Sequence, residues 1–209
     1  MELTSSIASA QSDMNASAMK TTMEELARKV DDLENRSRRS NLRLVGLPEF
    51  KEQGDMCAFL EKWILKTLGQ DNFPQPPVIE RAHRVGGPIR GHAPGSREST
   101  ARPRAVVMKF LNFADKVRVI QAARKKGNIF VDNNKVMFFP DLSSDLLKRR
   151  KVFDPVRKEL ASHSIRGLRY GIIYPATLLV TVRGRRHTFD TKSGAETFLY
   201  PTRTDNAYK

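Results

Sequence analysis

The chain has 209 residues, of which 37 are Lys or Arg and 23 are Asp or Glu, so its formal net charge is +14. This excess of positive charge, with a sequence pI near 10.2, predicts a polyanionic partner such as nucleic acid or an anionic membrane surface. No run of about 18 apolar residues occurs, and the N-terminus lacks a basic stretch followed by an apolar one, so we expect neither a membrane-spanning helix nor a secretory signal.

The N-terminal part predicts a short coiled coil at 16–38. The preceding segment at 1–15 is rich in Ser and Ala and is expected to be disordered or to form the fraying end of the helix. Apolar residues recur in the predicted helix at spacings of four and three, as in the seam of a coiled coil. The predicted seam consists of Met19, Met23, Leu26, Val30 and Leu33. Fewer than three heptads are present, so a single solvated helix that caps the next domain is the alternative interpretation.

Residues 39–140 predict a domain with the order β-α-β-β-α-β, the split βαβ sandwich. The expected elements are a strand at 41–47, a helix at 56–68, strands at 77–86 and 104–112, a helix at 113–126 and a strand pair within 128–142. A long loop rich in Gly, Pro and Ser precedes the third strand. The only cysteine, Cys57, lies on the first of these helices and cannot form an internal disulfide, so we expect a reducing compartment, the cytoplasm or the nucleus.

Residues 141–200 predict a small basic domain of helices and strands, followed by a loose tail at 201–209. Its first helix should be kinked or doubled, because Asp154 and Pro155 have the form of an N-cap and a first helical residue. Two or three strands follow, and Asp190 is expected to cap a last helix. The parts together predict the α+β fold class.

Catalytic chemistry leaves few traces in the sequence. It contains no phosphate-binding glycine loop and no metal-binding spacing of Cys and His, and its four histidines are scattered without a clustered carboxylate or nucleophile partner. We therefore predict no catalytic residue, no metal and no cofactor, and we do not expect an enzyme.

Basic residues instead gather at the edges of the predicted elements, in three sets. One set lies between the coil and the first strand, one in the long loop, and one on the first C-terminal helix. Their members are Arg36, Arg38, Arg39 and Arg43; Arg97, Arg102 and Arg104; and the run Lys148–Lys151. A solvated surface would explain any one set, but three sets flanking short domains favour the neutralisation of phosphates.

Single-stranded nucleic acid also needs aromatic side chains on which its bases can stack. The first and third strands of the predicted sheet offer only Phe110, so the usual platform on the sheet face is not predicted. Tyr174 is the better candidate, because it is close in sequence to Arg169 and directly precedes a proline that restricts the backbone. The alternative is that Tyr174 packs in the core.

Several segments in succession are similar to those of one known family. They are NRSRRSNLRLVGLPE, ERAHRVG, RPRAVVMKF, AARKKG, DLS at 141–143, and YPATLLV. In this order the sequence resembles the first-open-reading-frame protein of long interspersed element (LINE, type one) retrotransposons, or a domesticated or truncated relative. The resemblance implies a trimeric coiled coil, an atypical RNA-recognition motif at 39–140 and a basic C-terminal domain.

The resemblance also implies what these parts do. They would bind single-stranded RNA, and single-stranded DNA as well, and chaperone the exchange of nucleic-acid strands. The protein would be a homotrimer in cytoplasmic ribonucleoprotein particles, with no membrane partner and with nuclear entry left open. The implied RNA-binding residues are Arg43, Arg97, Arg102, Arg104, Arg124, Arg150, Lys151 and Tyr174.

One departure from the family bears on the trimer. The family's coil carries a motif in which an arginine is followed by two apolar positions and a glutamate, and this chain has KVDDLE at 29–34. Lys29 stands in place of the arginine, and lysine lacks the planar fork that pairs with a carboxylate through two hydrogen bonds. We therefore expect a weaker trimer.

Other interpretations of the same sequence belong to different classes. The chain could be a monomeric RNA-binding module whose helix is only a cap. A domesticated structural adaptor would have lost its retrotransposition function and would hold protein partners, but the presence of Arg102, Arg104 and Tyr174 argues against it. A leucine-zipper DNA binder is disfavoured, because its basic helix precedes the heptads, whereas here the basic residues follow them.

Overall fold

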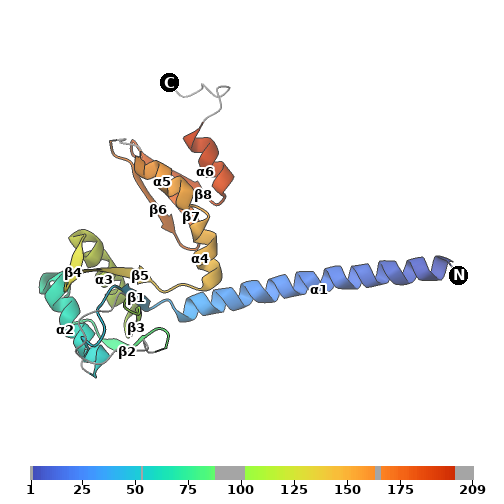
Figure 1. Ribbon diagram of the computed structural model, residues 1–209. Helices are drawn as coiled ribbons and strands as arrows, with labels where there is room; N and C mark the ends of the chain where they lie inside the picture. Colours follow the sequence, from blue (N-terminus) through green and yellow to red (C-terminus); the bar gives the residue numbers. More distant parts are fainter. Residues whose placement is uncertain (1, 53, 88–101, 163–165, 201–209) are drawn as a thin grey trace. The chain divides into compact units, whose positions relative to one another are not determined.

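The computed structural model describes residues 2–52, 54–87, 102–162 and 166–200, and Figure 1 shows the succession of its helices and strands. Its contacts divide the chain into two compact units. We call residues 32–141 the central unit, and residues 1–31 together with 142–209 the flanking unit. Both contain helices and antiparallel sheets, which confirms the predicted α+β class.

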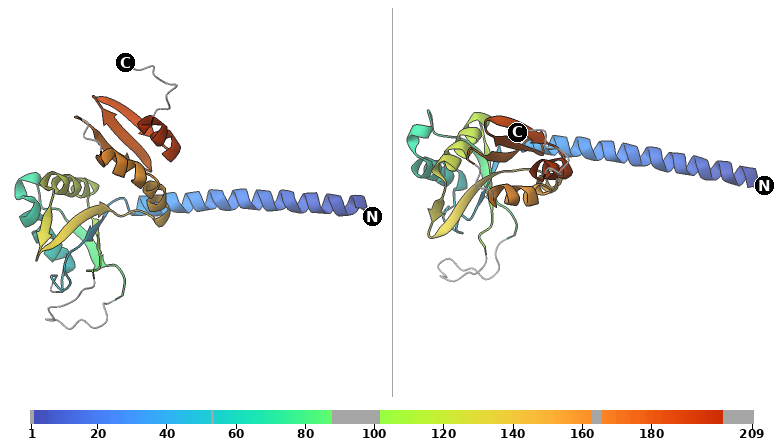
Figure 2. Two further views of the ribbon diagram at one scale, coloured as in Figure 1. Left: turned by 45° about the horizontal axis from the view of Figure 1, so that its top comes forward. Right: turned by 90° about the horizontal axis from the view of Figure 1, so that it is seen from above.

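The first element is one long helix, α1, which spans Glu2–Ser37 and runs without a break in both views of Figure 2. Of the two interpretations of residues 1–15, the structure has the helical one from Glu2 onward, and not the disordered one. No Gly or Pro occurs before Gly46, and several Ala, Met and Glu residues favour helix, so nothing interrupts it. The residues of the predicted seam are all between 55% and 68% exposed in the single chain.

The central unit is built on a five-stranded antiparallel sheet with the strand order β2-β3-β1-β5-β4. The strands are β1 (Asn41–Val45), β2 (Ile79–Arg84), β3 (Val106–Phe110), β4 (Ile129–Val131) and β5 (Asn134–Pro140). The helices are α2 (Met56–Leu68), the short 3-10 helix η1 (Gln70–Asn72) and α3 (Phe113–Lys126). The first and third strands of the unit thus lie side by side in the middle of the sheet.

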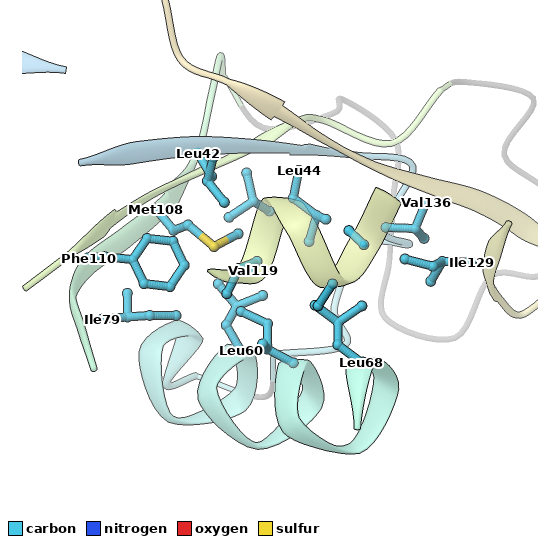
Figure 3. Close-up of a cluster of buried hydrophobic side chains, with 14 of the residues drawn as sticks. Leu42, Leu44, Leu60, Leu68, Ile79, Met108, Phe110, Val119, Ile129 and Val136 are labelled. Carbon is cyan, nitrogen blue, oxygen red and sulfur yellow. The ribbon is translucent and has the colours of Figure 1, made fainter. Parts of the chain in front are cut away.

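Helices α2 and α3 pack on one face of this sheet and enclose the core (Figure 3). Leu60, Ile64 and Leu68 recur on α2 at helical spacing and are buried there. Asp55 caps the start of α2 by accepting a hydrogen bond of 3.0 Å from the Ala58 amide. The strands contribute Leu42, Leu44, Ile79, Val106, Met108, Phe110, Ile129 and Val136.

The flanking unit contains a three-stranded antiparallel sheet with the order β6-β7-β8. Its strands are β6 (Arg169–Ile173), β7 (Thr177–Val182) and β8 (Arg185–Phe189), and its further helices are α4 (Ser144–Lys151), α5 (Asp154–Ser162) and α6 (Lys192–Leu199). The core of this unit consists of Phe153, Val156, Leu160, Leu178, Val180 and Ala195. The helix predicted to be kinked or doubled around Pro155 is doubled, since α4 ends before Pro155 and α5 begins beside it.

The N-termini of α3 and α6 differ in how they are capped. Asn112 occupies the N-cap position of α3, but its side chain makes no capping hydrogen bond. The cap of α6 is Thr191, whose hydroxyl accepts a hydrogen bond of 3.3 Å from the Gly194 amide. Asp190 instead accepts a hydrogen bond of 2.6 Å from the Thr177 hydroxyl, so its carboxylate bonds to β7 and does not cap α6.

Two further findings hold for the described ranges. None of the helices there combines the length and the apolar content needed to cross a bilayer. The His, Cys, Asp and Glu side chains of the same ranges nowhere form a group of three that could hold a metal ion.

Candidate nucleic-acid interface

The face of the central sheet that lies opposite α2 and α3 carries exposed aromatic and basic side chains. Successive residues of a strand point to opposite faces. On β5, Val136 and Phe138 pack toward the helices, so Met137 and Phe139 lie on the other face, which we call the open face. Phe139 is 44% exposed and lies directly across from Arg43 on β1. The open face thus places an accessible ring beside an arginine.

A second exposed ring lies at the edge of the same face. Phe130 on β4 is 60% exposed and pairs with Lys135 on β5. The register of the strands places further basic residues on this face: Arg81, Lys109 and Lys135. Two rings among basic side chains can offer both stacking and charge to a single-stranded nucleic acid.

Neither ring was predicted, because the expected stacking platform was confined to the first and third strands. Phe110, the single aromatic residue there, is fully buried on the helix side. Phe138 and Phe139 are adjacent in β5, so only one of them can face the core, and Phe138 does so by stacking on Trp63 with 5.9 Å between ring centroids. The strand alternation of NKVMFFP was the signal that could have identified Phe139.

Arg43 is also part of a polar cluster at the edge of the open face. The buried carboxylate of Asp141 accepts hydrogen bonds from Arg43 Nη2 at 3.2 Å, Arg38 Nη1 at 3.1 Å and Asn41 Nδ2 at 3.2 Å. Arg38 further pairs with Glu34 at 2.8 Å. A buried carboxylate requires such donors. Arg43 therefore has a structural partner, while about a third of its side chain, 35%, stays exposed.

The loop arginines occupy different environments. Arg97 lies outside the described residues. Arg102 is exposed, and no carboxylate of the described ranges lies within ion-pair distance of it. Arg104 is held by Glu49, which accepts hydrogen bonds from the Arg104 amide at 2.8 Å and from Nη2 at 2.9 Å. Of these predicted contacts, Arg102 is accessible, and Arg104 is largely engaged within the fold.

Glu49 belongs to a buried network around Arg84, which no sequence pattern indicated. The side chain of Arg84 is only 4% exposed, and all five of its N–H groups have acceptors. Nε and Nη2 donate to Glu52 at 2.8 Å each, and the other bonds reach the carbonyls of Leu47, Pro48 and Arg104 at 2.6–3.1 Å. Arg84 thereby ties the end of β2 to the segment that follows β1 and to the segment that precedes β3.

Arg124 lies at the C-terminal end of α3 beside a cavity of about 180 Å³. The cavity lies between α3 and β5 and is also lined by Ile120, Gly127, Met137 and Phe139. Arg124 is exposed, so its guanidinium is available at the rim. This arrangement places Arg124 beside the same cavity as residues 136–139 of β5.

In the flanking unit, Tyr174 lies in the turn between β6 and β7 and is 60% exposed. The alternative that it packs in the core is therefore wrong. Arg150 on α4 donates to the carbonyls on either side of it, with 2.6 Å from Nη2 to the Ile172 oxygen and 3.0 Å from Nη1 to the Pro175 oxygen. Arg150 thus holds the backbone that presents the Tyr174 ring, while the neighbouring Lys151 is exposed.

No model of a known protein family matches the chain. The LINE-1 retrotransposable element ORF1 protein of Mus musculus is 24% identical over 182 residues, which are 83% of this chain and 46% of that protein. The LINE-1 type transposase domain-containing protein 1 is 29% identical in Mus musculus and 31% in Homo sapiens, over 87% and 73% of this chain and 22% and 17% of those proteins. The chain is a homologue of these LINE-1 proteins.

This LINE-1 homologue spans less than half the length of each of these curated relatives. The family resemblance noted in the sequence is thereby confirmed. The implied RNA-binding residues are divided between the two units: Arg43, across from Phe139, and Arg124 belong to the central unit, while Arg150, Lys151 and Tyr174 belong to the flanking unit.

The network around Arg84 predicts a dependence of stability on pH. Burial of Glu49 opposes its ionisation, but the hydrogen bonds from Arg104 and the charge of Arg84 outweigh it and lower the pKa of Glu49 below its ordinary 4.5. The hydrogen bond from Arg84 lowers the pKa of Glu52 in the same way. A carboxyl group with a lowered folded-state pKa stabilises the fold fully above its unfolded pKa, and this contribution is lost as the pH falls through the folded pKa.

We therefore expect the free energy of unfolding of the central unit to decrease as the pH falls below about 4.5. Trp63 is the only tryptophan and lies in this unit, so its fluorescence in urea titrations at several pH values measures the effect. Glu49→Gln should flatten the profile, whereas Glu80→Gln, at a more exposed pair with Lys109, should leave it unchanged. A wild-type profile that stays flat down to about pH 3 would contradict the prediction.

Proposed function

We propose that the chain binds single-stranded RNA as a coiled-coil homotrimer and chaperones nucleic-acid strands within a retrotransposon-associated ribonucleoprotein particle. The names of its relatives, a LINE-1 ORF1 protein and LINE-1 type transposase domain-containing proteins, support the association with a retrotransposon. The net charge of +14 supports a polyanionic partner. RNA is the proposed ligand, and single-stranded DNA is expected to bind to the same surfaces.

The open face of the central sheet is the observation that carries this proposal. The strand order, with β1 and β3 in the middle and both helices on one face, is what an RNA-recognition motif requires, and such motifs stack bases on aromatic residues of the free face. Here Phe139 and Phe130 would supply the rings, from β5 and β4 instead of the two central strands. We therefore regard the unit as an atypical RNA-recognition motif.

The flanking unit supplies a second proposed contact. Arg150 holds the turn that carries Tyr174, so that the exposed ring can stack on a base without being ordered first. Lys151 and other basic residues of α4 lie nearby in the sequence and would neutralise phosphates. In this proposal Arg150 acts mainly by positioning Tyr174.

Self-association is the third element of the proposal. The five seam residues of α1 are more than half exposed in the single chain, and a row of exposed apolar residues at coiled-coil spacing favours pairing with other copies. Asp31 pairs with Arg149 of α4 at 2.6 Å. Because Asp31 comes one residue after Val30, it lies on the side of α1 that faces away from the seam. This ion pair therefore leaves the seam free for other helices.

RNA titrations test the proposal directly. Tyr174→Ala and Phe139→Ala should each lose about 1–3 kcal/mol of binding to a single-stranded oligonucleotide, because each removes a stacking surface. Tyr174→Phe and Phe139→Tyr keep the ring and should bind nearly as the wild type does. Fluorescence anisotropy measures the affinities, and thermal melts should stay within about 1 kcal/mol of wild-type stability. Wild-type protein that fails to bind RNA would refute the proposed function.

A further inference from the structure

Two cations lie against one partly exposed aromatic ring in the central unit. Arg39 follows α1, and its Cζ is 4.4 Å from the centroid of the Phe113 ring. Lys116 lies one turn further along α3, and its Nζ is 5.2 Å from the same centroid. A cation within about 6 Å of a ring centroid is attracted to the face of the ring. Phe113 thus gathers two positive charges from distant parts of the sequence.

Nearby carboxylates do not neutralise these two charges. Asp115 pairs with Arg118 at 2.9 Å, and on the other side Glu34 and Asp32 pair with Arg38 and Arg36 at 2.8 and 2.7 Å. Over the described ranges, no carboxylate oxygen lies within ion-pair distance of Arg39 or Lys116. The ring is therefore the main feature that offsets their mutual repulsion.

The state of Lys116 agrees with a local excess of positive charge. Burial, followed by the charges of Arg39 and Arg124, lowers the pKa of Lys116 below its ordinary value. An anion held between the two cations would remove this repulsion and would be bound by charge-assisted hydrogen bonds. The guanidinium of Arg39 offers a planar fork that suits the oxygens of a phosphate, and the Lys116 ammonium offers a compact charge.

We propose that Arg39 and Lys116 together bind one phosphate group of a single-stranded nucleic acid, with Phe113 holding the two cations in place. The site rests on the proposed RNA binding and adds a contact on α3, away from the open face. Further along the same helix, Arg124 lies at the rim of the cavity between α3 and β5. A strand whose phosphate is bound at Arg39 and Lys116 could continue along α3 toward that cavity.

The protein itself offers a matched control. Lys125 is on the same helix, is exposed, and lies nine residues after Lys116, which at about 100° per residue places it on the opposite side of α3. Lys116→Gln and Lys125→Gln therefore remove the same charge from the same helix. Only the first should affect the proposed site.

The test measures binding of a single-stranded RNA oligonucleotide over a range of salt concentrations. Arg39→Gln/Lys116→Gln should reduce the log–log salt slope by about 0.7, the value for one phosphate on a single strand, and weaken binding about fivefold near 0.1 M salt. A reduction of about 1.4 would mean that the two cations neutralise two separate phosphates, and it would overturn the proposal that they share one. If the double variant binds like Lys125→Gln, the site itself is overturned while the proposed function stands. If the wild type does not bind, both fall.

Two further measurements separate binding from folding. Lys116→Gln removes a repulsion, so its melting temperature should equal or exceed that of the wild type, and a decrease would assign Lys116 a structural role instead. In the unmutated protein, the oligonucleotide should protect Lys116 from an amine-acetylating reagent and leave Lys125 reactive, as read by mass spectrometry. If RNA leaves the reactivity of Lys116 unchanged, as it should that of Lys125, the proposal is overturned.

Discussion

Replacing Arg84 by Met is expected to destabilise the central unit by about 3–5 kcal/mol, the usual cost of removing one partner from a buried ion pair. The substitution leaves the Glu52 carboxylate without the arginine that pairs with it and leaves Glu49 with Arg104 alone. It also removes the donors to the carbonyls of Leu47 and Pro48. Buried groups that lose their partners cost more than the hydrogen bonds themselves contribute.

Urea denaturation followed by Trp63 fluorescence measures this loss in the unit concerned. Arg81→Met provides the matched control, because Arg81 lies on the same strand, β2, but is exposed, and its loss should change the free energy of unfolding by no more than about 0.5 kcal/mol. The free energy of unfolding of Arg84→Lys should lie between those of Arg84→Met and Arg81→Met, since lysine keeps the charge but not the five-donor fork. Equal stabilities of Arg84→Met and Arg81→Met would show that the network contributes nothing.

Placing an aspartate in the seam of α1 is expected to give the largest effect on RNA binding. In a trimer, Leu26→Asp would bring three carboxylates together in an apolar core, where burial and mutual repulsion both oppose association. The protein should become monomeric while its central and flanking units stay folded. Loss of the linkage between three binding sites should weaken RNA binding by about 10²–10⁴-fold.

Light scattering gives the mass, and RNA titrations on the same samples give the affinity. Thr21→Asp introduces the same charge outside the seam, where Thr21 is exposed and bonds only the Ser17 carbonyl of its own helix, and it should remain trimeric. Wild-type chain that stays monomeric up to about 100 μM, a ceiling for any useful coil affinity, would refute self-association. The monomeric RNA-binding module would then be the better interpretation.

The structure also changes how two predicted contacts should be tested. Arg102 and Arg104 form a pair in the sequence, but Arg104 is bound to Glu49 and Arg102 is exposed. A double substitution would therefore mix a loss of stability with a loss of charge. Arg102→Ala alone is the cleaner test of a phosphate contact, because its exposed side chain has no described ion partner to leave behind.

The sequence by itself determined the α+β class, the order of the elements, the positions of α2 and α3, and the family resemblance. These follow from local signals, namely the spacing of apolar residues, the helix start at Asp154 and Pro155, and breaks at Gly and Pro, all of which act over a few residues. Tertiary structure alone decided which aromatic residues are exposed. Phe110, Phe139 and Tyr174 are all aromatic residues in or next to apolar strand segments, but Phe110 is buried and the other two are exposed.

Only the tertiary structure could also decide which basic residues are engaged within the fold. Nothing in the sequence near Arg84 or Arg102 indicates which of them is engaged, yet Arg84 meets Glu49 and Glu52 from another segment while Arg102 is exposed. The same holds for Arg39 and Lys116, which come together only because both approach the Phe113 ring. Charge interactions depend on distance in space and on burial, and a linear pattern contains neither.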